Sequence, residues 1–158
     1  MDEPATQRLD GAVGAWRRGV EPPDLITRHV MIRIVRLGTP RIPGEGTRIG
    51  TVRRPPRGVP KSQYARQNWY DVWFPNLAPS LPTMKLAQQA TTPSQWTTFA
   101  RKYRAEMSAP DVRRTIELLA ALSHTTDFSV GCYCENEERC HRSILRRLLV
   151  EHGARVAP

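Results

Sequence analysis

The residues best equipped for chemistry lie in one stretch near the end of the chain. It holds all three cysteines, Cys132, Cys134 and Cys140, and Cys140 is followed directly by His141 and Arg142. A thiol beside a histidine and an arginine is in an electropositive setting, which lowers its pKa and exposes a nucleophilic thiolate. Cys140 and His141 are therefore the candidate catalytic residues, and the candidate substrates are phosphate-bearing or sulfur-carrying molecules.

Three interpretations of this cluster stay open at the level of sequence. In the first, Cys140 is a nucleophile or a redox thiol, as in cysteine phosphatases or rhodanese-type sulfur carriers, and reacts faster than Cys132 and Cys134. In the second, the cysteines and His141 bind zinc. The C-x-C pair and the adjacent Cys-His pair are unlike two C-x2-C knuckles, so we predict no metal and no cofactor. In the third, Cys140 is only a small apolar residue at the end of a helix face.

The cysteine stretch predicts a strand, a loop and a helix in that order. Residues 128–134 read as a buried strand, and residues 135–139 form a polar loop. Four apolar residues then recur at helical spacing before Gly153, which favours the end of a helix: Ile144, Leu145, Leu148 and Leu149. Cys140, His141 and Arg142 are thus expected in the first helical turn, where free backbone N–H groups and the helix dipole attract anions.

A second candidate group lies around the long aperiodic segment 55–80, where basic residues alternate with aromatic ones. Such a mixture can clamp phosphates and stack on a nucleobase. We expect the segment to fold over the helix start and to complete a basic, aromatic-lined pocket. The candidate anion- and substrate-binding residues are Arg54, Arg57, Lys61, Tyr70, Asp71, Trp73 and Arg142. In the alternative interpretation, the aromatic side chains fill the edge of a small core and the arginines are solvated.

The rest of the chain predicts the elements that hold these groups. Two strands are expected, one in the segment that Met31 opens and one over residues 48–54. Ser80 and Thr92 are typical helix N-caps, and a third helix is expected to follow Asp111. Together they predict an α/β fold with a small, largely parallel sheet and helices packed on it. We expect residues 31–158 to form the single domain and residues 1–30 to be a flexible extension.

The charge balance favours an anionic partner. Lys and Arg number 24 against 15 Asp and Glu, a net charge of +9. The expected partner is a phosphate-bearing small molecule or nucleic acid. In an alternative function, a diffuse basic surface serves a non-catalytic nucleic-acid-binding or assembly protein. The sequence shows no membrane-spanning run, no export signal and an odd number of cysteines, which together favour a cytoplasmic protein with reduced thiols.

The order of these segments resembles the YeaO-like family of bacterial proteins, a DUF488-type family of unknown function. The likeness covers roughly residues 32–155. It is carried by Arg57-Gly58 with Lys61, Trp73 with Leu77-Ala78-Pro79-Ser80, Tyr103 with Glu106, and Cys140-His141-Arg142. It implies a compact α/β domain. Many members have Asn-His in place of Cys140-His141, so the resemblance points to His141 as the shared element.

Overall fold

The computed structural model describes residues 29–158, so nearly all of the predicted extension 1–30 lies outside the described residues. The described part contains a four-stranded sheet in which every pairing is parallel, with the strand order β1-β4-β2-β3. The strands are β1 (Ile32–Arg36), β2 (Thr47–Gly50), β3 (Val72–Trp73) and β4 (Phe128–Cys132). The predicted α/β fold is confirmed.

The strand β4 forms the centre of the sheet, and each of its five residues is buried. It pairs with β1 on one side and with β2 on the other, so Val130 lies between Ile34 and Ile49. A strand with neighbours on both sides and covered faces is expected to be apolar throughout, as the sequence FSVGC nearly is. Because all strands are parallel, the ends of β1, β2 and β4 lie at the same edge.

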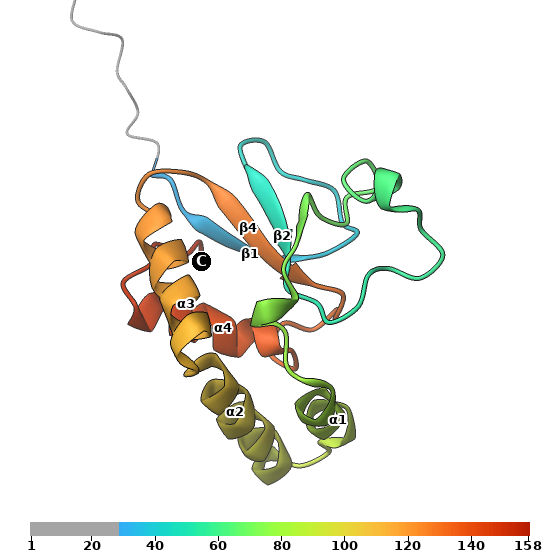
Figure 1. Cartoon of the computed structure of the whole chain (residues 1–158), viewed down its shortest axis with the longest axis vertical. Helices are drawn as coiled ribbons and strands as arrows, with labels where there is room; N and C mark the ends of the chain where they lie inside the picture. Colours follow the sequence, from blue (N-terminus) through green and yellow to red (C-terminus); the bar gives the residue numbers. More distant parts are fainter. Residues whose placement is uncertain (1–28) are drawn as a thin grey trace, which may run out of the picture.

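Four α-helices surround the sheet: α1 (Leu81–Gln89), α2 (Pro93–Met107), α3 (Pro110–Leu122) and α4 (His141–Glu151). In Figure 1 they gather below and to the left of the sheet. The predicted caps of the first two are confirmed, since Ser80 caps α1 and Thr92 forms a reciprocal capping box with Gln95. Among the described residues, no helix has the length and apolar character that a membrane span needs.

The main core lies between the sheet and the helices. Its members are buried apolar side chains from β1, β4, α2, α3 and α4, joined by Leu77 just ahead of α1: Ile32, Leu77, Phe99, Tyr103, Met107, Ile116, Leu119, Phe128, Val130, Ile144, Leu145, Leu148 and Leu149. The apolar face predicted for the last helix points into this core, since Ile144, Leu145, Leu148 and Leu149 are all members of it. Burial of these side chains, at roughly 1.5–3 kcal/mol each, is the main force that holds the helices to the sheet.

Two strands are shorter than the sequence predicts. The second strand ends at Gly50 rather than at residue 54, and the last strand ends at Cys132 rather than at residue 134. The reason is the length of the neighbouring strand, since Cys132 already pairs with Arg36, the final residue of β1. Cys134 therefore lies outside the sheet and is exposed, which makes the prediction of a buried strand wrong at this position.

A fully buried ion pair ties two loops to the sheet. Arg48 in β2 donates from Nε to Glu45 Oε1 at 2.6 Å and from Nη2 to Glu45 Oε2 at 2.9 Å. Its Nη1 also donates to the carbonyl oxygens of Thr39, at 2.8 Å, and Asn68, at 2.7 Å. The Ser129 hydroxyl of β4 donates to Glu45 at 2.7 Å. Burial opposes ionisation of Glu45, but the hydrogen bonds and charge of Arg48 keep its pKa below the usual 4.5.

We predict that Arg48→Met lowers the free energy of unfolding by about 3–5 kcal/mol, because it leaves the Glu45 carboxylate buried without its cation. Urea unfolding at pH 7 measures the change. The matched control is Arg113→Met, which breaks an exposed pair with Glu117 on α3 and should cost less than about 1 kcal/mol. Equal losses in the two variants would contradict the structural role of the buried pair.

The same pair predicts a pH dependence of stability. Because the pKa of Glu45 is lowered in the folded state, its contribution is present above pH 4.5 and is lost as the pH falls through the lowered value. The difference in unfolding free energy between the wild type and Glu45→Gln should therefore shrink as the pH falls below 4.5. A difference that stays constant from neutral to acid pH would show that ionised Glu45 contributes nothing.

Candidate functional site

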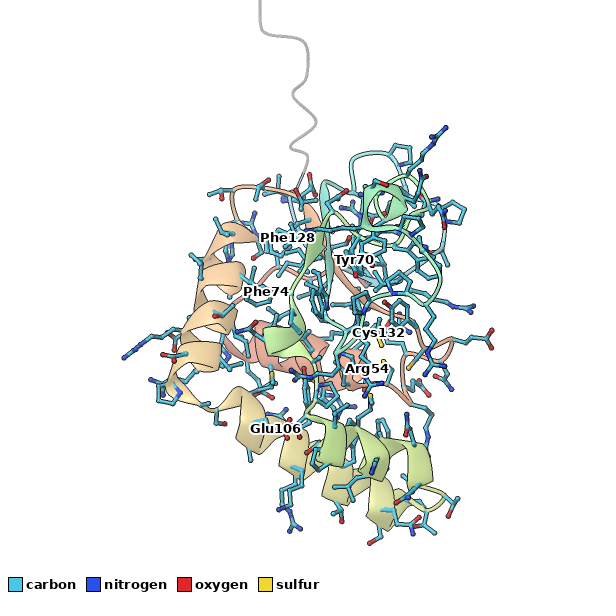
Figure 2. The ribbon with its side chains drawn as sticks, turned by 45° about the vertical axis from the view of Figure 1, so that its right-hand side comes forward. Arg54, Tyr70, Phe74, Glu106, Phe128 and Cys132 are labelled. Atoms are coloured by element: carbon cyan, nitrogen blue, oxygen red, sulfur yellow. The ribbon has the colours of Figure 1, made fainter. Side chains whose placement is uncertain are left out.

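A cavity of about 880 Å³ lies at the edge where β1, β2 and β4 end. The chain that follows each of these strands lines it, and Met84 and Ala87 of α1 with Phe99 of α2 close the far side. Its volume is within the range of small-molecule sites, and the carboxyl edge of a parallel sheet is where such sites usually form. Figure 2 shows Cys132 and Arg54, two of the lining residues, on the same side of the molecule above α1.

The charged lining of the cavity is entirely basic. Five arginines line it, and none of the described lining residues is an aspartate or a glutamate. The arginines come from the end of β1, from the loop after β2 and from the residue before the N-cap of α4: Arg36, Arg53, Arg54, Arg57 and Arg139. Arg36 is paired with Glu135, an exposed residue outside the lining, at 3.1 Å, so the positive potential that favours an anion comes mainly from the other four arginines.

The arginines differ in how far they are already engaged. Arg53 donates to the carbonyl oxygens of Ala78 and Pro79, and Arg139 donates to Ala90 O at 2.7 Å. Arg54 and Arg57 are exposed, and among the described residues neither guanidinium has a hydrogen bond or an ion pair. These two side chains are therefore the donors that remain available to a ligand.

One wall of the cavity is aromatic and apolar. The rings of Trp69 and Tyr133 lie edge to face with their centroids 5.7 Å apart, and both line the cavity. The Tyr133 hydroxyl donates to the Arg54 carbonyl at 2.9 Å, which fixes the ring beside the basic segment. This wall offers flat apolar surface against which a ring of the ligand can stack.

The floor of the cavity holds the three thiols and His141. Cys132 and Cys140 are buried, and Cys134 is exposed. The Sγ atoms of Cys132 and Cys134 lie 3.8 Å apart. Hydrogen bonding to Cys132 lowers the pKa of Cys134 to about 3 and also lowers the pKa of Cys140, while the pKa of Cys132 itself is raised. The cluster therefore holds thiolate character at neutral pH.

Cys140 precedes the helix rather than lying within it. It is the N-cap of α4, with an extended backbone at φ −134° and ψ 150°, and helical geometry begins at His141. The two side chains can therefore approach the same point from different directions. The ligand atoms of Cys132, Cys140 and His141 all lie within 4.8 Å of one another, close enough to hold a metal ion.

His141 is buried and has a fixed orientation. Its Nε2 lies 2.9 Å from the carbonyl oxygen of Thr51. A carbonyl can only accept, so Nε2 carries the proton and Nδ1 keeps its lone pair as an acceptor. Nδ1 lies 3.7 Å from Cys140 Sγ, and the Tyr103 ring packs edge-on against the imidazole with centroids 5.5 Å apart.

Arg142 lies behind the floor, outside the lining of the cavity. It is 2% exposed, and its Nη2 donates to the carbonyl oxygen of Cys134 at 2.7 Å. Among the described residues, its Nε has no hydrogen-bond partner although it is buried. Arg142, which the sequence predicted to bind an anion, instead holds the loop that contains Cys134 against α4.

The other predicted binding residues also lie outside the cavity lining. Lys61 is exposed on a short 3-10 helix. Tyr70 is buried, and its ring packs so closely on Gly50 that a Cβ atom added to this glycine would lie 2.3 Å from the ring. Asp71 accepts two hydrogen bonds from Arg41 and one from the backbone of β2. Trp73 donates from its indole nitrogen to Val52 O at 2.8 Å. The structure thus brings together Cys140, His141, Arg54 and Arg57 and separates the rest.

Five lining residues were not among the candidate binding residues: Arg36, Arg53, Trp69, Tyr133 and Arg139. Arg53 and Trp69 nevertheless belong to the basic and aromatic region around segment 55–80 that the sequence indicates. A signal for two of the others was also present. Arg36 is the last residue of β1 and Tyr133 follows β4 directly, so both lie at the carboxyl edge of a parallel sheet. Arg139 was identifiable as well, because it directly precedes Cys140 in the sequence.

Residues 32–153 match a family model, DUF488-N3a, whose description is the active DUF488-N3 subclade. The match begins at the first residue of β1 and ends just after α4, so it includes the whole sheet, all four helices and the floor of the cavity. It confirms the DUF488-type resemblance read from the sequence. No curated protein and no solved structure matches the chain.

We predict that Cys134 is the first of the three thiols to be alkylated in chelator-treated protein, because it alone is exposed and its pKa is lowered to about 3. Iodoacetamide labelling, followed on each cysteine peptide by mass spectrometry, gives the three rates. The Cys134 rate should be nearly constant from pH 5 to 8, whereas an ordinary thiol gains about tenfold per pH unit in that range. Faster labelling of Cys140, or an ordinary pH dependence at Cys134, would rule out this assignment.

Proposed function

This chain belongs to the DUF488-N3a family, and from its cavity we propose that it binds a phosphate-bearing small molecule of about nucleotide size. One observation carries the proposal: five arginines and no carboxylate among the described residues that line one cavity. A guanidinium offers two parallel N–H donors to a phosphate, so a wall of arginines is suited to this group.

The proposal assigns different tasks to the arginines. Arg54 and Arg57 contact the phosphate groups, because their guanidinium groups are free of other partners among the described residues. Arg53 and Arg139 shape the wall, since backbone carbonyls already hold them, and they add to the positive potential. This division explains why the two exposed arginines are the ones to substitute in a binding experiment.

The aromatic wall binds the part of the ligand that carries no phosphate. Trp69 and Tyr133 provide ring faces and edges, and Met84 and Phe99 extend the apolar lining. A base or another flat ring can stack there while the phosphates reach the arginines. The cavity volume of about 880 Å³ accommodates a molecule of this size.

We place any chemistry at the floor of the cavity. Cys140 and His141 are its buried reactive groups, and His141 is held by Thr51 with Nδ1 as an acceptor. In this arrangement the ligand binds with its phosphates at the mouth and presents its reacting group to the floor. Binding itself does not depend on that step and can be tested alone.

We predict that Arg57→Ala and Arg54→Ala each weaken binding of ADP by about 1.5–3 kcal/mol, the loss of a charge-assisted hydrogen bond. Isothermal titration calorimetry at fixed ionic strength measures the affinity. Arg101→Ala is the matched control, because Arg101 is exposed on α2 and does not line the cavity. It should change the affinity only by the small, salt-screened background of one surface charge.

The same three variants distinguish ADP binding in a specific pocket from ADP binding to a diffuse basic surface. If each weakened ADP binding by the same small amount, and moderate salt removed the difference, there would be no specific pocket. A single-stranded oligonucleotide that bound more tightly than ADP, with equal losses in all three variants, would favour the non-catalytic nucleic-acid-binding alternative.

A further inference from the structure

The floor of the cavity gathers four metal-ligating side chains from three consecutive parts of the chain. Cys132 ends β4, Cys134 lies in the loop, Cys140 caps α4 and His141 begins it. The ligand atoms of Cys132, Cys140 and His141 lie within 4.8 Å of one another, and Cys134 Sγ is 3.8 Å from Cys132 Sγ. Three of the four side chains are buried, so the group is part of the folded interior rather than a surface cluster.

The two closest separations match the edges of a zinc tetrahedron. With Zn–S bonds of about 2.3 Å and a Zn–N bond of about 2.0–2.1 Å, two sulfur ligands are about 3.8 Å apart and a sulfur and a nitrogen about 3.6 Å apart. The separation between Cys132 Sγ and Cys134 Sγ is 3.8 Å, and that between Cys140 Sγ and His141 Nδ1 is 3.7 Å. These two edges of the tetrahedron are therefore already at their expected lengths.

The orientation of His141 is that of a metal-binding histidine. Its Nε2–H donates to the carbonyl oxygen of Thr51 at 2.9 Å, which directs the lone pair of Nδ1 toward the thiols. Metal-bound histidines commonly donate their other ring N–H to a carbonyl or carboxylate in this way, because the hydrogen bond fixes both tautomer and ring direction.

A buried cation lies beside the thiols. Arg142 is 2% exposed, donates to the carbonyl oxygen of Cys134 and has a buried Nε without a partner among the described residues. Three thiolates and a neutral histidine around a divalent ion carry a net charge of −1. The guanidinium balances that charge, which gives a buried arginine with an orphaned N–H a physical reason to be there.

From these observations we propose that Cys132, Cys134, Cys140 and His141 bind one zinc ion at the floor of the cavity. The sequence argued against a metal because Cys140 and His141 seemed to occupy adjacent helical positions. In the structure Cys140 is an extended N-cap residue, so the two side chains converge. Cys134, the exposed ligand, faces the cavity and lies where a bound molecule can approach the ion.

The proposal goes beyond anion binding and does not depend on it. Binding of the ion displaces the protons of the three thiols to solvent, and no oxidant or reductant takes part. Zinc content can be measured with no ADP present, and ADP binding can be measured after a chelator has removed the metal. Failure of one proposal is therefore distinguishable from failure of the other.

The experiment measures metal content in the full chain expressed with zinc in the medium. Elemental analysis after dialysis should give one zinc per chain for the wild type, and replacement by Co²⁺ should produce thiolate-to-cobalt charge-transfer absorption of a tetrahedral site. Cys132→Ser, Cys140→Ser and His141→Gln should lose the metal. The matched control is His29→Gln, at an exposed histidine far along the chain, which should keep the full zinc content.

A second measurement needs no variant and covers the case in which a substitution prevents folding. Zinc should slow iodoacetamide labelling of all three cysteines in the wild type at least about tenfold, and a chelator should restore it. Wild-type protein without zinc, unprotected thiols, or a loss of two hydrogen masses that marks a Cys132–Cys134 disulfide would each overturn the proposal. So would full zinc content in a folded Cys140→Ser variant.

Discussion

The buried pair between Arg48 and Glu45 is the interaction on which the surroundings of the cavity depend. It joins β2 to the loop after β1 through Thr39, to the long segment before β3 through Asn68, and to β4 through Ser129. Two of the acceptors, the carbonyl oxygens of Thr39 and Asn68, lie in loops outside the helices and strands, and Arg48 gives each of them a donor. Loss of the pair would release these loops, and the walls of the cavity are built from them.

The residues that the family resemblance singles out surround the same cavity in several layers. Tyr103 packs against His141 and donates to Leu77 O at 2.7 Å, while Glu106 accepts hydrogen bonds from Ser80 and Thr83 at the start of α1. These contacts fix the helix that closes the cavity. The residues that line the cavity and the residues that support them are thus connected, and Arg57 lies at the exposed end of the lining.

The sequence predicted what depends on local pattern and missed what depends on neighbours. Alternating apolar residues gave the strands, and the caps at Ser80 and Thr92 gave the helix starts, because these signals are contained in a few adjacent residues. Arg48 gave no such signal, since an arginine in a strand is usually exposed and only Glu45 makes its burial tolerable. Arg142 was predicted to face a ligand because an arginine is usually exposed, but tertiary packing buries it.

The position of β4 has a consequence for how the chain reaches this fold. The two strands formed first, β1 and β2, do not pair with each other, and Val130 must enter between Ile34 and Ile49 before either has a partner on that side. Nearly a hundred residues separate Ile34 from Val130, so closing the sheet costs chain entropy before it gains contacts. On the ribosome β1 must therefore wait without a strand partner until the cysteine segment has been synthesised, and β2 has only the two residues of β3 to pair with. During that interval the helical hairpin of α1 and α2, with its short-range contacts, is the part that can already fold.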